Sequence, residues 1–315
     1  MTLNLGFTHV IHKVKFYKLL NLVFFKKQIL RSKELEYIDV PVLDKKQPGK
    51  YRLTKQPTLF PHRIMSYVFD EVGLDITDEQ INLYWDRAIA AGEGWASAES
   101  RHRVPIGLYG DAAVLYTQVR REKLLCLWLN IPIWRPTSVR YSRFLLWSME
   151  FKDLLPRKTI NTVLRWIVWS LNAMWTGKHP MTRMGGRRLK QAEQGRAGSF
   201  LTRRQLEFQL TELRGDWEFH KLVWQLPACG WTSLHVCFKC TACSKSRDPN
   251  LLYWNFDDNN SRWHREEFST AEFIAYRLPE EHVCNFAALG TLTFNLNLGN
   301  LSTFIFKFLL KENVS

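Results

Sequence analysis

The sequence contains no apolar run long enough to cross a bilayer, which requires roughly 18 to 20 residues in a helix. The longest candidate, TINTVLRWIVWSLNAMW, carries Arg165 in its middle. We therefore expect no membrane span and no membrane partner. Of the 315 residues, 46% are hydrophobic and 14% are aromatic, which is ample for a packed core and excludes a disordered chain.

Acidic residues are missing near both ends of the chain. None precedes Glu34, and none lies between Glu281 and Glu312. Residues 1–33 fit a transit peptide, a basic arm or a wrongly predicted first exon, whereas the short apolar piece LLNLVFF lacks a secretory cleavage site. The net charge of +14 favours a polyanionic partner, which is either nucleic acid or an anionic membrane face.

Cysteines are few and unevenly placed. Two of the six are isolated, while Cys229, Cys237, Cys240 and Cys243 lie close together. This clustering in a large chain favours a metal site over disulfides. The pair Cys237-x-x-Cys240 could place two thiolates on a structural Zn²⁺ ion, with Cys229 or Cys243 as a third ligand and a histidine or Cys284 as a fourth. The alternative is a set of buried free cysteines near a strand end.

Local patterns divide the chain into regions of different character. Pro41, Pro48 and Pro57 stand among charges and predict an extended linker over 34–58. Thr77 and Gln80 are placed to start a helix. The regions are a basic arm and linker (1–58), a helical region (59–100), an α/β domain (101–280) and an atypical tail (281–315).

The α/β domain shows a characteristic order of elements. Periodicity predicts strands near 104–110, 123–133, 140–149 and 206–214, and a helix over 159–175 between the last two strands. The first strand is expected to end near Asp111 and the last near Asp216. This order predicts a ribonuclease H-like mixed sheet with flanking helices, in which the fourth strand runs parallel beside the first. A basic segment, 178–204, is expected to be an exposed loop.

Asp111 and Asp216 would meet in such a sheet. Neighbouring carboxylates repel each other unless a hard cation lies between them, and Mg²⁺ or Mn²⁺ accepts such oxygen ligands. Two ions held there could cleave or transfer a phosphodiester strand. Asp216 also follows a glycine before a helical pattern, so an ordinary helix N-cap is the alternative.

Several segments together resemble a known family. The segments are PIGLYGDAA, KLLCLWLNIPIWRP, SRFLLWSME, TINTVLRWIVWSLNAM, TELRGDWEFHKLVW, VCFKC and LLYWNFDDNNSRW. They resemble, over about residues 57–279, a protein family repeated many times in dinoflagellate genomes, which is similar to DDE transposases of the KDZ and Plavaka type.

The resemblance implies specific roles for a few residues. Asp111 matches the first catalytic acid, Asp216 the second, and Cys237 with Cys240 the inserted cysteine pair. The third acid of such enzymes would lie after residue 279, where this chain departs from the pattern. The resemblance therefore implies a truncated, nuclear, DNA-binding relative of a transposase that is weakly active or inactive, with oligomers possible.

Overall fold

The computed structural model describes the middle of the chain and parts of its C-terminal third. The residues described are 35–47, 49–91, 96–116, 121–136, 142–215, 219, 222–223, 234, 236, 241–254 and 262. The chain divides into two compact units, with the boundary between Arg214 and Gly215. No helix within the described ranges is long and apolar enough to span a bilayer.

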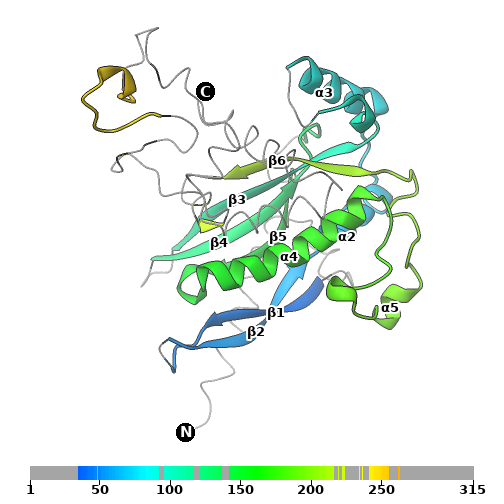
Figure 1. The fold of residues 1–315 in the computed structure, drawn as a ribbon. Coiled ribbons are helices and arrows are strands. Elements are labelled where there is room, and N and C mark those ends of the chain that lie inside the picture. Colours follow the sequence, from blue (N-terminus) through cyan, green and yellow to red (C-terminus); the bar gives the residue numbers. More distant parts are fainter. Residues whose placement is uncertain are drawn as a thin grey trace. The chain divides into compact units, whose positions relative to one another are not determined.

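A four-stranded mixed sheet forms the centre of the first unit (Figure 1). Its strands are β3 (Val104–Tyr116), β4 (Arg121–Asn130), β5 (Arg143–Glu150) and β6 (Phe208–Gly215), in the spatial order β5-β4-β3-β6. The first three form an antiparallel meander. Strand β6 runs parallel to β3, because Val104 N donates to Glu207 O near the start of both strands and Gly107 lies beside Glu212 further along.

The four strands expected from periodicity therefore exist, but β3 is longer than expected. Asp111 does not end the strand; it lies within it and pairs with Cys126 of β4. The preceding residue, Gly110, also stays in register, opposite Leu127. The segment AAVLY continues the strand because it stays paired with β4, from Ala112 opposite Leu125 to Tyr116 opposite Arg121.

The predicted crossover helix is also present. Helix α4 (Pro156–Trp175) begins with a proline at a position that needs no N–H donor. Its apolar residues recur at helical spacing and are buried. These residues are Ile160, Val163, Leu164, Ile167, Val168, Leu171 and Met174.

The expected linker over 34–58 is wrong, because this segment forms a β-hairpin. Strands β1 (Leu35–Leu43) and β2 (Tyr51–Leu59) pair antiparallel. Ile38, Val40 and Val42 lie in the core, while Tyr37, Asp39 and Leu43 are exposed. Prolines are tolerated because a strand with only one neighbour has an edge that needs no N–H donor.

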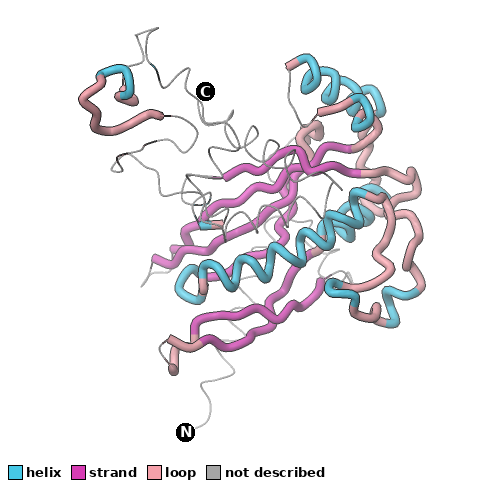
Figure 2. Tube along the Cα trace, viewed as in Figure 1, coloured by secondary structure: helices cyan, strands magenta, loops and turns pink. Residues whose placement is uncertain are grey.

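The helical region predicted before the sheet is confirmed. Helix α2 (Pro61–Asp70) packs against α4, and helix α3 (Asp78–Ala90) follows it. The N-terminus of α3 has a full capping box, in which the Thr77 and Gln80 side chains each accept from the other's backbone N–H. The short helices are η2 (Ala98–Ser100), η4 (Phe151–Asp153), η5 (Met184–Gly186), α5 (Gln191–Gln194) and η6 (Pro249–Leu251). Figure 2 distinguishes these helices from the strands and loops.

Candidate functional site

Asp111 belongs to a polar group on one face of the mixed sheet. Tyr109 stands two residues earlier on β3 and therefore on the same face. Its hydroxyl donates to Asp111 Oδ2 over 3.0 Å, and the backbone N–H of Ala112 donates to Oδ1 over 2.7 Å. The Arg143 guanidinium of β5 stacks on the Tyr109 ring, with Cζ 4.3 Å from the ring centre. The pairing of β3 with β4 and of β4 with β5 thus brings together the Asp111 carboxylate, the Tyr109 phenol and the Arg143 guanidinium.

The electrostatics of this group keep Tyr109 protonated. Burial raises the pKa of Tyr109, and the Asp111 charge and hydrogen bond raise it further, while Arg143 partly opposes the shift. A protonated phenol can donate to Asp111 throughout the neutral pH range. The Asp111 carboxylate is only partly buried and each oxygen has a second lone pair, so it can still ligate a cation.

A second polar group lies on the same sheet, nearer the start of β3. A Cβ atom added to Gly107 would lie 2.5 Å from Asn130 Oδ1 and 3.1 Å from Glu212 Cβ. Glu212 is buried on β6, and Arg214 donates to its Oε1 over 2.9 Å. Gly107 and Asp111 are four residues apart on an extended strand, roughly 13 Å. Glu212 therefore belongs to a group separate from Asp111.

The predicted carboxylate pair is only half described. Asp216 lies outside the described residues, directly after the last residue of β6. Within the ranges that the structure covers, no three His, Cys, Asp or Glu side chains are grouped to hold a metal ion. Of the two predicted carboxylate ligands, the structure thus describes only Asp111, and the Mg²⁺ or Mn²⁺ site stays a prediction.

The predicted zinc ligands fall almost entirely outside the described residues. Cys229, Cys237 and Cys240 are not described. Cys243 is buried in the second unit, where its backbone N–H donates to Leu251 O and its Sγ lies 3.1 Å from Thr241 O. Such a position suits either a metal ligand or a buried thiol, as expected from the sequence.

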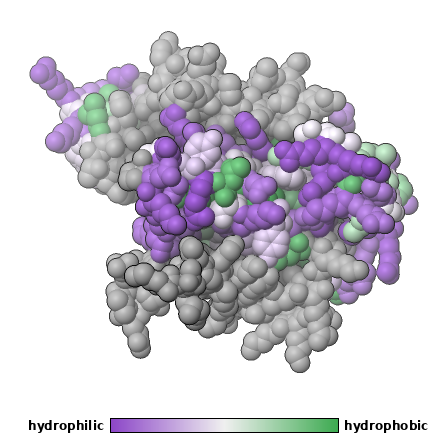
Figure 3. Space-filling view, turned by 90° about the horizontal axis from the view of Figure 1, so that it is seen from below, coloured by the Kyte–Doolittle hydropathy of each residue, from purple (hydrophilic) through white to green (hydrophobic). Residues whose placement is uncertain are grey.

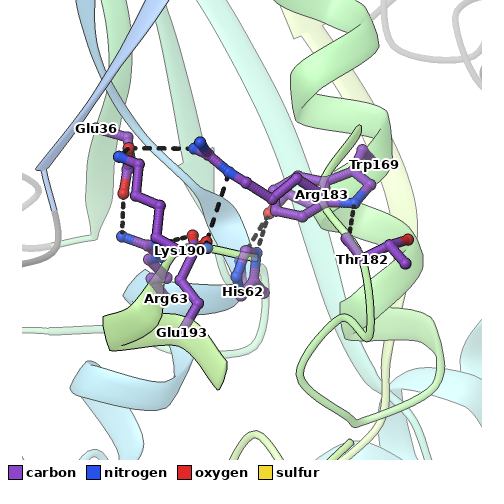
Figure 4. A network of polar contacts seen from close by, with 9 residues as sticks. Glu36, His62, Arg63, Trp169, Thr182, Arg183, Lys190 and Glu193 are labelled. Atoms are coloured by element: carbon purple, nitrogen blue, oxygen red, sulfur yellow. Dashed lines mark hydrogen bonds and ion pairs between the residues drawn. The ribbon is translucent and has the colours of Figure 1, made fainter. Parts of the chain in front are cut away.

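The basic segment over 178–204 is more ordered than the expected exposed loop. Backbone bonds between His179 and Ser199 and between Leu201 and Gly177 close its base. A partly buried ion cluster, defined as Glu36, Arg63, Arg183, Lys190 and Glu193, ties the segment to β1 and α2 (Figure 4). Trp169 Nε1 of α4 also donates to Thr182 O over 3.1 Å.

This anchoring leaves several cations of the segment and of α4 at the surface. From Pro156 to Arg204 the sequence has eleven lysines and arginines but a single acid, Glu193. This carboxylate already pairs with Arg63 in the ion cluster. Arg165, Arg187 and Arg188 are exposed, and none of them pairs with a carboxylate in the part of the chain that the structure describes. Figure 3 shows one face of the molecule, where the coloured residues are mostly hydrophilic.

Sequence reasoning missed three of these features. Tyr109 stands two positions before Asp111, so the two-residue repeat of a strand could have predicted that both side chains lie on the same face. The contact of Arg143 with Tyr109 can be deduced only once the register of β4 and β5 is known. The ion cluster joins Glu36 to Glu193, and no local pattern links residues so distant in the chain.

Comparisons with known proteins give no relative for this chain. No protein family model matches it, and neither a curated protein nor a solved structure shows significant similarity.

Proposed function

We propose that this chain is a transposase-derived DNA-binding protein with a ribonuclease H-like sheet and a partial two-metal site, which cleaves DNA weakly at most. The observation that supports this proposal is the strand order β5-β4-β3-β6, with β6 parallel to β3 and joined to β5 through α4. Gly107 of β3 lies beside Glu212 of β6. Asp111 and Asp216 each stand four positions further along the sequence.

The proposed chemistry follows from carboxylates shared between two strands. Asp111 and Asp216 would bind Mg²⁺ or Mn²⁺, which neutralises their mutual repulsion and activates a water molecule for attack on a phosphodiester. Tyr109 holds Asp111 through its hydroxyl, so it acts as a positioning residue. Two ions normally need a further acid, and Glu212 is held by Arg214 too far from Asp111 to supply it. Weak or absent cleavage is the consequence.

The proposed DNA contacts are three exposed arginines, Arg165, Arg187 and Arg188. Cations without carboxylate partners are available to neutralise phosphates, and each neutralised phosphate releases counterions. The ion cluster anchors the backbone of the segment that carries Arg187 and Arg188, which lowers the entropy lost on binding.

The test measures DNA binding and cleavage with the same proteins. Fluorescence anisotropy on duplex and single-stranded oligonucleotides at several salt concentrations should show affinity that falls steeply with salt. The double variant Arg187→Ala/Arg188→Ala should bind more weakly on every sequence and lower the salt slope by about 2. Arg101→Ala is the matched control, because Arg101 is exposed but already paired with Asp86.

Cleavage is assayed on plasmid and oligonucleotide substrates in Mg²⁺ and Mn²⁺. Asp111→Asn and Asp216→Asn should each abolish any metal-dependent nicking and leave DNA affinity nearly unchanged. Vigorous nicking by the wild type would contradict the partial site. Nicking that survives both substitutions would contradict the two-carboxylate site. Salt-insensitive or absent binding would contradict the DNA-binding function.

A further inference from the structure

The hairpin of β1 and β2 carries a surface that plays no part in the proposed DNA binding or cleavage. The two strands form a sheet of their own (Figure 1). One face of this sheet carries Ile38, Val40 and Val42, which are buried in the core, and β1 packs against α4. Successive side chains of a strand point to opposite faces, so the residues between these three belong to the other face, called the outer face below. Its exposed residues are Tyr37, Asp39, Leu43, Tyr51, Leu53 and Lys55.

Four large apolar side chains are exposed on the outer face. Leu53 is 65% exposed, Tyr51 53%, Tyr37 41% and Leu43 37%. Leu43 and Tyr51 stand directly opposite each other in the register, and Leu53 follows two residues after Tyr51 on β2. A single exposed apolar residue is ordinary on a protein surface, whereas several on one face indicate a surface of interaction.

The outer face also carries one acid and one base. Asp39 of β1 stands directly opposite Lys55 of β2, and both side chains are exposed. Neither makes an ion pair with any residue that the structure describes. At the turn end of the hairpin, Lys45 pairs with Asp153, and Lys158 Nζ of α4 lies 4.6 Å from the centre of the Tyr51 ring. The charges of Asp39 and Lys55 are therefore available to a partner, with apolar residues on either side of them.

We propose that the outer face binds the same face of a second copy of this chain. A two-fold axis that runs between the two strands and parallel to them places β1 of each copy over β2 of the other. Asp39 then lies over Lys55 of the partner subunit, and Leu43 lies over the partner's Tyr51. Two sheets that pack face to face with aligned strands form the ordinary interface of a β-sandwich. The outer face is therefore complementary to itself in charge as well as in apolar character.

The size of the outer face sets the strength of this dimer. Each strand of the hairpin has nine residues, which gives the face an area of roughly 300 Å². Stable complexes bury about 800 Å² on each partner, so the dimer is weak and its population depends on protein concentration. The dimer is independent of the proposed DNA-binding function, because none of the residues of the outer face belongs to the proposed DNA contacts or to the metal site.

The test measures sedimentation velocity of the full chain without DNA, at concentrations up to about 1 mM. The wild type should sediment faster as its concentration rises. Asp39→Lys and Lys55→Glu should each weaken the dimer about tenfold or more, because each gives the outer face two charges of one sign that meet the same charges of the partner. An equimolar mixture of the two variants should restore the dimer. The variants change the net charge of the chain in opposite directions, so a general charge effect would not weaken both.

Leu53→Ser tests the apolar part of the interface and should weaken the dimer about tenfold or more, since each dimer buries this side chain twice. Leu83→Ser is the matched control, because Leu83 is 49% exposed but lies on α3, and it should leave the dimer unchanged. Circular dichroism confirms that each variant is folded. A wild type that stays monomeric at every concentration would overturn the proposal and leave the outer face to a different partner. A dimer that survives both charge variants, or a mixture that fails to restore it, would assign the dimer to another surface and overturn the proposal as well.

Discussion

Gly107 shows how the absence of one side chain shapes the sheet. Asn130 and Glu212 come from the two strands that flank β3, and their side chains occupy the space above Gly107. The nearest of these atoms is Asn130 Oδ1, which is buried without a hydrogen-bond partner among the described residues. A methyl group has no room there unless both side chains move.

Gly107→Ala should therefore destabilise the protein by about 1 to 3 kcal/mol, the usual cost of overpacking a closed site. The comparison is Gly195→Ala, where φ is −65° and no atom lies within 4 Å of the added carbon. That substitution should stabilise by about 0.4 to 1 kcal/mol, because it restricts the unfolded chain. Urea unfolding of both variants measures the difference. Equal urea midpoints for the two variants would show that the space above Gly107 can accept a methyl group.

The ion cluster joins the hairpin β1–β2, helix α2 and the basic segment. Glu36 receives contacts from Arg63, Arg183 and Lys190, at 3.1, 3.3 and 2.5 Å. Burial raises the pKa of Glu36, but the Lys190 hydrogen bond and the neighbouring cations outweigh it and lower the pKa below the ordinary value. Arg63 and Arg183 each contact both carboxylates, and the Arg63 side chain is the more buried of the two, at 4% exposed against 16%.

Arg63→Met should remove the more buried of the two arginines that Glu36 and Glu193 share and cost about 3 to 5 kcal/mol, the range for breaking a buried pair. Arg101→Met removes an ion pair whose side chains are 50% and 52% exposed, so its cost should be at most about 1 kcal/mol. Chemical denaturation with circular dichroism compares them. A small loss for Arg63→Met would mean that solvent reaches the cluster.

Considered as a whole, the protein carries buried neutral histidines in a strongly basic chain. In the unfolded chain His62 and His179 bind a proton near pH 6.5, but in the folded protein both pKa values are lower, that of His179 about 4. The unfolded state therefore binds more protons below about pH 6.5, and acid favours unfolding. The low pKa of Glu36 acts in the same direction at still lower pH.

The free energy of unfolding should accordingly be highest above about pH 6.5 and fall steadily as the pH is lowered towards 4. Urea unfolding at several pH values measures this fall. His179→Gln should make the decline shallower, because it removes one of the titrating groups. A profile that is flat between pH 6.5 and 4 would contradict the burial of the two imidazoles.

Sequence patterns predicted the sheet better than its surroundings. Strands β3 to β6 and helix α4 follow from repeats of two and of about 3.6 residues, since one face of each element must be buried. The hairpin was missed because Pro41 and Pro57 outweighed the alternation of Ile38, Val40 and Val42. The cluster around Arg63 and the stacking of Arg143 on Tyr109 depend on long-range register, which periodicity does not encode.

The junction made by Glu36, Arg63 and Glu193 also bears on the order of folding. Its members come from β1, α2 and the segment before β6, so it cannot form until widely separated parts of the chain have closed their loops. Contacts of this kind slow folding because the entropy of loop closure precedes any gain. If they are absent from the transition state, they chiefly retard unfolding. The ion cluster would then lower the unfolding rate of the first unit and prolong the lifetime of its native state.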